Sequence, residues 1–317
     1  TDSICSAIAY AELKNKTSDL VCEARRAGKM NQETEFVLKK FGVKPPRMCT
    51  DVNPKIRDVD YREMPGIPGT TSLRKAWEIM RTSATQPLKK PIKSMGGLIG
   101  GEAKKLEAHY GRKKSICGDV LGKAMTYAMA VLEVNASMGL IVAAPTAGSA
   151  GVVPGMMLAL QECYRISDQR IIDALYNAGA VGYLAMRNAT VAGAVGGCQA
   201  EIGVASAMAA SAAVELMGGT PQQCLDAAST VLMNMLGLVC DPVGGLVEYP
   251  CQNRNAAGVA NALIAAEMAL AGLSQLIPFD EMLETMYTVG KRLPAELRET
   301  AMGGCAIAPS ACAACHM

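Results

Sequence analysis

The sequence predicts an all-α fold: a compact multi-helix domain with glycine-rich loops, preceded by a short helical N-terminal extension. Three observations lead to this prediction. Apolar residues recur at helical spacing in most segments, and capping residues separate those segments. Alternating strand patterns are almost absent. Half of the 317 residues are apolar, yet there are 31 Gly and 20 Met against 3 Phe and 1 Trp, and small side chains let helices approach closely.

Residues 1–90 are predicted to form the helical N-terminal region. Its helices are expected over Leu13–Gly28, Asn31–Phe41 and Thr71–Thr82. Thr71 or Ser72 caps the third helix, because a side-chain oxygen can accept from the free N–H groups of the first turn. Loops are expected over Met64–Thr71 and Gln86–Pro91, where proline and glycine interrupt the helical pattern.

Residues 91–317 are predicted to form the main domain. Its helices are expected over Glu102–Tyr110, Asp119–Val134, Asp168–Met186, Gln199–Met217, Pro221–Met235, Arg254–Ala271, Phe279–Val289 and Pro294–Ala301. The clearest boundary is Gly218-Gly219 followed by Thr220-Pro221, which ends one helix and caps the next. The glycines and proline of Val239–Val247 predict an irregular loop.

Charge is distributed unevenly along the chain. Residues 1–114 contain 23 Lys and Arg against 13 Asp and Glu, whereas residues 115–317 contain 8 against 16. So few charges in the second part predict that much of its surface is buried against a partner chain or a second copy. Nucleic-acid binding is not expected, because no motif combines aromatic and basic residues.

A membrane location is not expected either. The uncharged stretch 134–161 contains Pro145 and Pro154, which divide it into pieces too short to span a bilayer. The first residues lack the basic and apolar parts of a secretory leader. Twelve cysteines without such a leader predict reduced thiols and a cytoplasmic location.

A glycine-rich loop precedes the helix predicted to begin at Glu102. Its backbone N–H groups form either a flexible turn or an anion cradle that suits a substrate carboxylate. The substrate-binding candidates in this loop are Ser94, Gly96, Gly97, Gly100 and Gly101.

Two uncharged stretches, 135–139 and 144–151, combine hydroxyl groups with glycine. Hydroxyls in so apolar a setting are costly to bury without partners, so they are either helix caps or ligand contacts. The candidate ligand contacts are Asn135, Ser137, Thr146, Gly148 and Ser149.

Three cysteines lie where loops meet helices. Cys198 begins a predicted helix, where the macrodipole lowers the pKa of a thiol. Cys240 and Cys251 flank a Gly/Pro-rich loop that can fold back. From the residues alone, the three are either separate buried thiols or the ligands of a metal or cluster. Their spacing matches no zinc finger.

These motifs resemble the alpha part of iron–sulfur-dependent L-serine dehydratases (L-serine ammonia-lyases). The resemblance is carried by Asn135–Gly139, Ile141–Ser149, Gly197–Gly203, Leu236–Cys251, Asn253–Ala271 and Leu293–Ala301. It implies a carbon–oxygen lyase that converts L-serine to pyruvate and ammonia in amino-acid degradation and gluconeogenesis.

The resemblance also implies a [4Fe–4S] cluster held by Cys198, Cys240 and Cys251, with the fourth iron open to a substrate oxygen. Iron bound to the serine hydroxyl would take up the charge of the leaving group, while a base removes the α-proton. In some relatives a C-terminal cysteine occupies the open iron. The tail cysteines of this chain are Cys305, Cys312 and Cys315.

The chain departs from the family pattern in two ways. Gly96, Ile99 and Glu102 stand where the family's glycine loop usually has serine, threonine and aspartate, which leaves the exact substrate open. The β portion of the family contributes a histidine-containing motif, whereas this chain has only His109 and His316. A separate β chain is therefore expected to supply the base, with a homo-oligomer as the other expected assembly.

Two alternatives to a serine dehydratase stay open. One is a cluster-dependent lyase for another β-substituted amino acid, such as a cysteine desulfidase or a hydroxy-amino-acid dehydratase. The other is a non-catalytic subunit that carries the cluster. A pyridoxal-phosphate enzyme is not expected, because residues 124–290 contain no lysine for the Schiff base.

Overall fold

The computed structural model describes residues 2–17, 21–26, 30, 32–48, 69–111 and 115–314. These residues belong to two compact units, one within Thr1–Pro54 and the other within Lys55–Met317. The units divide earlier than the boundary predicted after residue 90, because helix α3 (Thr70–Lys89) packs against helix α5 (Gly118–Ala136) of the second unit. Within the described ranges, no helix has both the length and the apolar character that crossing a bilayer requires.

The first unit contains two helices and a short parallel pair of strands. Its elements are α1 (Asp2–Thr17), β1 (Arg25–Arg26), α2 (Gln32–Lys40) and β2 (Arg47–Met48). The helix predicted over Leu13–Gly28 is wrong. The Asn15 side chain accepts from Cys22 N at 2.6 Å and donates to Cys22 O at 2.9 Å, which ties non-helical chain back to the end of α1. The helix predicted over Asn31–Phe41 is confirmed to within one residue at each end.

The second unit is built from helices joined by turns. Its longer elements after α3 are α4 (Glu102–Gly111), α5, α6 (Val152–Tyr164), α7 (Asp168–Asn188), α9 (Val204–Leu216), α10 (Pro221–Asn234), α11 (Cys251–Leu270) and α12 (Phe279–Arg292). Its short elements are η2 (Ala147–Ser149), α8 (Gly193–Gly196), η3 (Gln199–Gly203), η4 (Val243–Gly245), η5 (Ala295–Leu297), η6 (Gly304–Ile307) and α13 (Pro309–Ala314). The predicted all-α fold is confirmed.

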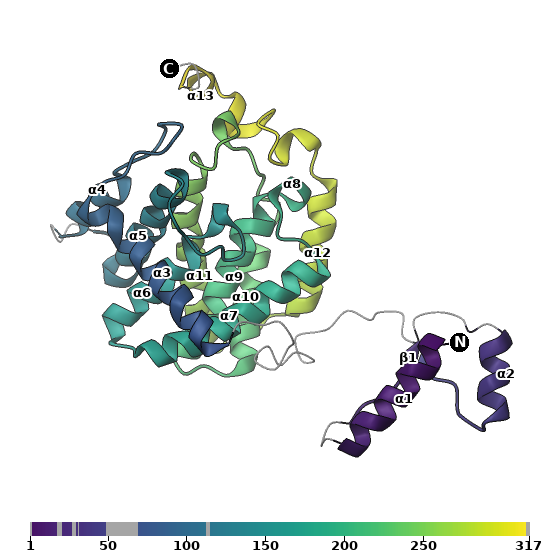
Figure 1. Cartoon of the computed structure of the whole chain (residues 1–317). Coiled ribbons are helices and arrows are strands. Elements are labelled where there is room, and N and C mark those ends of the chain that lie inside the picture. Colours follow the sequence, from purple (N-terminus) through teal and green to yellow (C-terminus); the bar gives the residue numbers. More distant parts are fainter. Residues whose placement is uncertain are drawn as a thin grey trace. The chain divides into compact units, whose positions relative to one another are not determined.

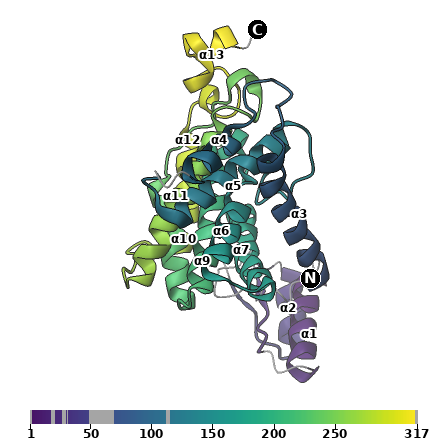
Figure 2. The ribbon, with the colours of Figure 1, turned by 90° about the vertical axis from the view of Figure 1, so that its left-hand side faces the viewer.

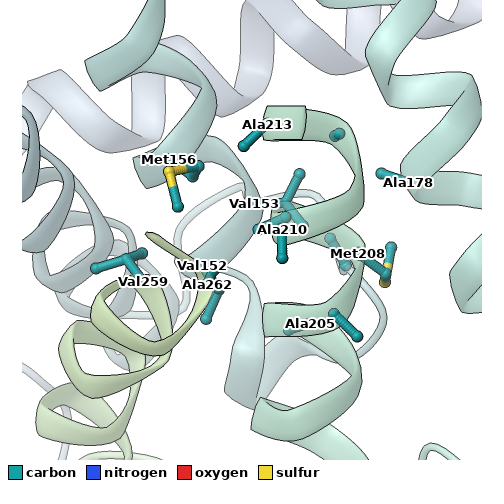
Figure 3. Close-up of a cluster of buried hydrophobic side chains, with 14 of the residues drawn as sticks. Val152, Val153, Met156, Ala178, Ala205, Met208, Ala210, Ala213, Val259 and Ala262 are labelled. Atoms are coloured by element: carbon teal, nitrogen blue, oxygen red, sulfur yellow. The ribbon is translucent and has the colours of Figure 1, made fainter. Parts of the chain in front are cut away.

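Helix α9 lies at the centre of the second unit, and α6, α7, α10 and α11 pack around it (Figure 1). Figure 3 shows Ala205, Ala210 and Ala213 of α9 in one cluster with Val153 and Met156 of α6. All five side chains are buried. Small side chains therefore form the contact between these helices, as the composition predicts.

Helix α6 is absent from the predicted elements, because Pro154 and the surrounding glycines indicate helix breaks. In the structure, Pro154 lies in the first turn of α6, where the N–H group that proline lacks would have had no partner in the helix. A Cβ atom on Gly155 would lie 2.8 Å from the carbonyl oxygen of Ala124, so glycine allows α6 to pack closely on α5. Pro154 and Gly155 are therefore compatible with a buried helix, and Gly155 allows its close packing.

Several other predicted boundaries are wrong. Helix α3 begins at Thr70 after Gly69, so neither Thr71 nor Ser72 caps it, and α12 continues to Arg292. Helix α3 continues to Lys89, through the predicted loop Gln86–Pro91, because Pro87 and Leu88 are buried. Helix α11 begins at Cys251, before the predicted start at Arg254. The helix predicted over Pro294–Ala301 is only the single turn η5.

The loop that joins α3 to α4 and the C-terminal helix α13 lie toward the same end of the second unit in both views (Figures 1 and 2). The irregular loop predicted over 239–247 is confirmed and contains η4. Hydrogen bonds connect this irregular loop both to the α3–α4 loop and to the segment before α13. Loops from distant parts of the sequence therefore meet at one end of the helices.

Candidate functional site

Two of the predicted cysteines converge with a carboxylate where η3 begins. Cys198 lies just before this π-helical turn, Glu201 lies within it, and Cys240 lies in the loop before α11. The two sulfur atoms and a carboxylate oxygen of Glu201 all lie within 4.8 Å of one another. Both cysteines are buried and Glu201 is half-buried. The fold therefore brings together three groups that can bind a metal.

Hydrogen bonds of Gln199 join the turn at Cys198 to the segment before Cys240. The backbone N–H of Gln199 donates to Leu238 O at 3.0 Å. Its side-chain oxygen accepts from Gly237 N at 2.8 Å. Because Gln199 is buried, these bonds are protected from water and fix the two cysteine-bearing segments side by side.

Cys240 is also held by the segment that follows α12. Its N–H donates to Leu297 O at 2.9 Å, and its carbonyl accepts from Glu299 N at 2.7 Å. Helix α8 closes the space beside the thiol, since a Cβ atom on Gly193 would lie 2.9 Å from Cys240 Sγ and 2.6 Å from Glu201 Oε2. Glycine at position 193 thus leaves room for the sulfur and the carboxylate.

The third predicted ligand, Cys251, is the first residue of α11 and is 8% exposed. Burial, followed by the negative charges of Cys198 and Glu201, raises the pKa of Cys251 to about 12. Cys251 is therefore within electrostatic reach of the converged group, although its sulfur is outside the set within 4.8 Å. Arg254, one turn further along α11, lies 3.6 Å from Cys198 Sγ through its Nη1, so the first turns of α11 lie beside the converged group.

Buried amide side chains hold the start of α11. Gln252 donates to Glu133 Oε1 of α5 at 3.3 Å. Asn255 donates to Gly148 O at 2.8 Å, which links α11 to η2. Both amides are at most 1% exposed. Since buried polar groups remain where their partners are, these bonds orient the helix end that carries Cys251.

A largely buried cation, Arg254, faces the thiols. Its Nη1 lies 2.7 Å from Asp241 Oδ1 and 3.6 Å from Cys198 Sγ, and it donates to Val239 O at 2.8 Å. The hydrogen bond from Cys240, and then the charge of Arg254, lower the pKa of Cys198. The same hydrogen bond raises the pKa of Cys240. Cys198 is therefore the thiol that more readily becomes a thiolate.

Three of the predicted ligand contacts lie beside the converged cysteines. Thr146 Oγ1 donates to Glu201 Oε1 at 2.9 Å and lies 3.0 Å from Ser149 Oγ. A Cβ atom on Gly148 would lie 3.5 Å from Glu201 Oε1. Burial raises the pKa of Glu201 against the opposing effect of the Thr146 bond. The hydroxyls of Thr146 and Ser149 therefore cap the η2 turn, and that of Thr146 also contacts the half-buried Glu201 carboxylate.

The predicted anion cradle holds a carboxylate of the chain itself. Glu248 is 2% exposed and accepts hydrogen bonds from Ser94 Oγ at 2.6 Å, Gly96 N at 2.7 Å and Leu98 N at 3.0 Å. The donor chemistry of the loop is thus the one predicted for binding a carboxylate. The carboxylate that it binds here comes from the loop between the second and third cysteines.

The other predicted glycines of this loop form local turns. Gly97, Gly100 and Gly101 have φ values of 77°, 150° and 97°, a region that favours glycine. The N–H of Gly100 donates to Glu102 Oε2 at 2.6 Å. A second carboxylate of the chain therefore accepts from this part of the loop.

Asn135 and Ser137, also predicted as ligand contacts, lie at the end of α5. The carbonyl of Asn135 accepts from Met138 N at 3.0 Å, and Ser137 Oγ donates to Val134 O at 2.9 Å. Ser137 also lines an open cavity of about 890 Å³ between α3 and the end of α5. These hydrogen bonds are those of a helix end. They agree with the interpretation of this stretch as a helix cap rather than as a ligand contact.

Glu133 is a fully buried carboxylate near the glycine loop. Its Oε1 accepts from Ala103 N at 2.9 Å, whereas its Oε2 has no hydrogen-bond partner among the described residues. Burial raises the pKa of Glu133 against the opposing effect of the backbone hydrogen bonds. A carboxylate with a raised pKa in the folded state binds its proton more tightly there than in the unfolded state.

We therefore expect Glu133 to make the folded protein less stable as pH rises through its raised pKa, since the folded state must then bury a charge. Glu133→Gln removes this charge and keeps an oxygen for Ala103. The free energy of unfolding of the variant should lie within about 1 kcal/mol of that of wild type at pH 5. Toward pH 8 the variant should become more stable relative to wild type. Urea unfolding at both pH values measures this. Glu107→Gln, at an exposed pair with Lys104, is the control without such a trend. An equal loss at both pH values would contradict the expectation.

The structure describes two of the three tail cysteines. The N–H of Cys305 donates to Asp241 Oδ2 at 2.6 Å. This bond links the tail to Asp241, which pairs with Arg254. The thiol of Cys312 lies 3.7 Å from Ala306 O. Cys315 lies outside the described residues. Among the described tail thiols, Cys305 thus has a backbone link to the site.

These donors fit a metal–sulfur group. Thiolate ligands select iron–sulfur clusters, zinc or copper(I), and all of these need deprotonated sulfur. Arg254 supplies positive charge that stabilises such sulfur. The donor set and the cation agree with a bound metal–sulfur group.

Two acidic residues of the site, Glu201 and Glu248, are absent from the predicted set. The sequence contains a usable signal for both, because Glu201 is the only charged residue in 188–214 and Glu248 the only one in 242–253. A lone charge in a stretch that will be buried needs a partner. Isolated carboxylates between glycine motifs are thus candidates for internal contacts.

Comparisons with known proteins identify the family. Residues 12–306 match the family described as serine dehydratase alpha chain. A Bacillus subtilis protein named probable L-serine dehydratase, alpha chain, is 52% identical over 219 residues, which cover 69% of this chain and 73% of that protein. The L-serine dehydratase alpha chain of Peptoniphilus asaccharolyticus is 50% identical over 229 residues, covering 72% and 78%. An Escherichia coli L-serine dehydratase is 44% identical over 183 residues, but only 40% of its length is covered. The chain therefore belongs to the serine dehydratase alpha chain family.

Proposed function

We propose that the chain is the catalytic alpha subunit of an iron–sulfur L-serine dehydratase, a lyase that converts L-serine to pyruvate and ammonia. The observation that carries this proposal is the convergence of Cys198 and Cys240 with Glu201; Cys251 begins α11, the helix whose Arg254 contacts Cys198. The names of the relatives from Bacillus and Peptoniphilus support serine as the substrate.

Cys198, Cys240 and Cys251 would hold a [4Fe–4S] cluster. When bound, the cluster supplies a Lewis acid that offsets the charge developing on the leaving hydroxyl group. Arg254 places its guanidinium beside Cys198, and this charge offsets that of the thiolate ligands. Burial of the thiols keeps bulk water away from the ligands and strengthens the interaction with Arg254.

The substrate contacts are assigned to residues of this chain and of a partner. Thr146, Gly148 and Ser149 lie next to the converged cysteines and are the proposed contacts for the carboxylate and amine of the amino acid. In the glycine loop, Ser94 and Gly96 donate instead to Glu248. The substrate is therefore assigned to η2 rather than to the cradle.

A separate β chain is proposed to supply the base that removes the α-proton. Of the two histidines of this chain, His109 is exposed on α4, and His316 lies outside the described residues. The relatives from Bacillus and Peptoniphilus are themselves named alpha chains, and the longer Escherichia coli relative contains much sequence beyond the match. All nine cysteines that the structure describes as thiols are free, which supports a reducing, cytoplasmic location.

A tail cysteine is proposed as the fourth ligand of the cluster when substrate is absent. The backbone link from Cys305 to Asp241 favours Cys305 over Cys312. A ligand from the tail would protect the open iron until an amino acid replaces it.

A lyase for another β-substituted amino acid is the second candidate. It is favoured by the contact of Gly96 with Glu248, since the family usually has a hydroxyl-bearing residue at this place. A panel of serine, threonine, cysteine and longer β-hydroxy amino acids separates the two candidates, because only the preferred substrate gives the highest kcat/KM.

Anaerobic purification together with a β chain tests the proposed function. We expect about four iron and four sulfide per alpha chain, and a brown colour that air bleaches along with serine dehydratase activity. A colourless, iron-free protein that still dehydrates serine would overturn the mechanism. A cluster-loaded complex without lyase activity on any amino acid of the panel would leave only a cluster-carrying role.

A further inference from the structure

Glu248 connects two loops of the site that are far apart in the sequence. It lies three residues before Cys251, in the loop that begins at Cys240, whereas its donors Ser94, Gly96 and Leu98 all lie in the glycine loop. The carboxylate is 2% exposed. Hydrogen bonds to a carboxylate are stronger than those between neutral groups, and the absence of water strengthens them further.

The glycine loop is a preformed receptor for this carboxylate. Ser94 N donates to Ile99 O at 3.0 Å, and Ile99 N donates to Ser94 Oγ at 3.2 Å, so the loop is closed on itself. The N–H of Met95 donates to Ala136 O at 2.9 Å, which anchors the loop to the end of α5. Because the glycine loop is held by its own hydrogen bonds and by the bond to α5, its remaining N–H and O–H donors have fixed positions.

The fit between the two loops is close. A Cβ atom on Gly96 would lie 2.8 Å from Glu248 Oε1 and would collide with the Leu246 side chain. The glycine loop therefore lies close against the Leu246 and Glu248 side chains, and a side chain at position 96 would make them shift. This approach brings the N–H of Gly96 to the carboxylate.

The cysteine loop is thus fastened near both of its ends. At the first end, the backbone of Cys240 bonds to Leu297 and Glu299. Near the second end, Glu248 bonds to the glycine loop. The single backbone bond from Val243 N to Tyr249 O, at 2.8 Å, spans the loop between them.

We propose that Glu248 is a positioning residue: its carboxylate clasps the glycine loop and thereby fixes Cys251 opposite the other two cysteines. The glycine loop then serves the metal site rather than the carboxylate of the substrate. This inference rests on the proposed function only for what the thiols bind, because the contacts themselves are independent of it.

Glu248→Gln tests the clasp with almost no change in shape. The carboxylate accepts through both oxygens, Oε1 from Gly96 and Oε2 from Ser94 and Leu98. An amide has one oxygen, so whichever way it turns, its NH₂ group faces a backbone N–H. At least one backbone donor of the glycine loop loses its acceptor on the buried side chain, and we expect local opening of the loop to become about ten- to a hundredfold more frequent.

The matched control is Glu102→Gln. Glu102 also accepts from a backbone N–H of the glycine loop, at 2.6 Å from Gly100, but it lies only two residues away and links no second loop. An internal control is Cys224, a thiol of α10 that is 5% exposed and whose alkylation reports opening of the helices. Cys251, by contrast, reports opening of the clasped loop.

Two measurements on the full-length chain separate this inference from the proposed function. The first is the rate of iodoacetamide alkylation of Cys251 and Cys224 in the metal-free chain, followed by mass spectrometry. The second is the iron and sulfide retained after anaerobic loading. We expect Glu248→Gln to speed alkylation of Cys251 by about tenfold or more and to leave Cys224 unchanged.

The outcomes are distinct. Faster alkylation of Cys251 alone, with less iron retained, supports the clasp. Faster alkylation in a chain that never binds iron, wild type included, supports the clasp and refutes the proposed function. Unchanged protection of Cys251 in Glu248→Gln, or equal effects from Glu102→Gln, refutes the clasp. If Glu248→Gln does not fold, Leu246 and Glu248 are kept and Ser94→Ala is used, which removes the bond from Ser94 Oγ to Glu248 together with the bond from Ile99 N to Ser94 Oγ, and alkylation of Cys251 against Cys224 is compared in the same way.

Discussion

Replacing Cys198 by serine is expected to lower kcat/KM for L-serine by about a thousandfold or more, because a Lewis-acid metal contributes several kcal/mol to the stability of the transition state. Cys198 is the thiol that carries negative charge most readily, since both Cys240 and Arg254 lower its pKa. A hydroxyl at this position stays protonated and does not replace a thiolate ligand. The same variant should retain less iron and sulfide after anaerobic loading.

The measurement is pyruvate release by the alpha chain together with its β chain, with iron and sulfide analysis of the same samples. Cys117→Ser is the control, since Cys117 is half-buried at the start of α5 and outside the converged group. Its activity and iron content should match wild type. Full activity and iron content in Cys198→Ser would show that this thiol is not a ligand.

Replacing Arg254 by methionine is expected to lower the free energy of unfolding by about 3–5 kcal/mol, because it leaves a buried charge without its partner. The side chain of Asp241 is 3% exposed and that of Arg254 is 15% exposed, so water cannot compensate for the lost pair. The backbone N–H of Cys305 still donates to Asp241, but one hydrogen bond does not neutralise the carboxylate. The pKa of Cys198 should also rise, because the positive charge next to its sulfur is gone.

Urea unfolding measures the first effect, and the pH dependence of thiolate absorbance measures the second. The double variant Arg254→Met/Asp241→Asn should recover much of the stability, because neither buried charge remains, but the pKa of Cys198 should stay high. Arg81→Met is the matched control, since the Arg81–Asp168 pair is about half exposed on both sides and such pairs contribute up to about 1 kcal/mol. Equal losses from Arg254→Met and Arg81→Met would contradict the assignment of a buried pair.

The predictions of local structure succeeded where local signals decide the outcome. Thr220 and Pro221 cap and begin α10 as predicted, with a reciprocal hydrogen bond between Thr220 and Gln223. Ser167 caps α7 by accepting from Arg170 N. Capping depends on residues within one turn of each other, so these boundaries can be predicted from the sequence.

Predictions of local structure failed where burial overrides local preference. Pro87 lies inside α3, and Pro154 lies in the first turn of α6, although both residues indicate breaks. Leu88 and Met156 next to them are buried in the common core. At Pro87, packing against α5 outweighs the cost of about 3 kcal/mol that proline has inside a helix, whereas Pro154 in the first turn loses no helical hydrogen bond.

The role of the glycine loop required the tertiary structure. Its composition predicts donors for a carboxylate, and the donors are present. Whether that carboxylate belongs to a substrate or to the chain depends on which distant segment comes close, and Glu248 lies about 150 positions further along the sequence. Spacing along the chain contains no information on such an approach.

The sequence by itself determined the helical class and the family, and it predicted the three cysteine ligands, because each of these depends on residue type, short-range periodicity or contiguous motifs. Only the tertiary structure decided which side chains come together. Glu201 and Arg254 lie beside Cys198, Asp241 accepts from the backbone of Cys305, and Glu248 binds the glycine loop. The physical reason is that a buried charge is stabilised by whatever lies within a few ångströms in space, and those neighbours come from segments that the folding of the whole unit brings together.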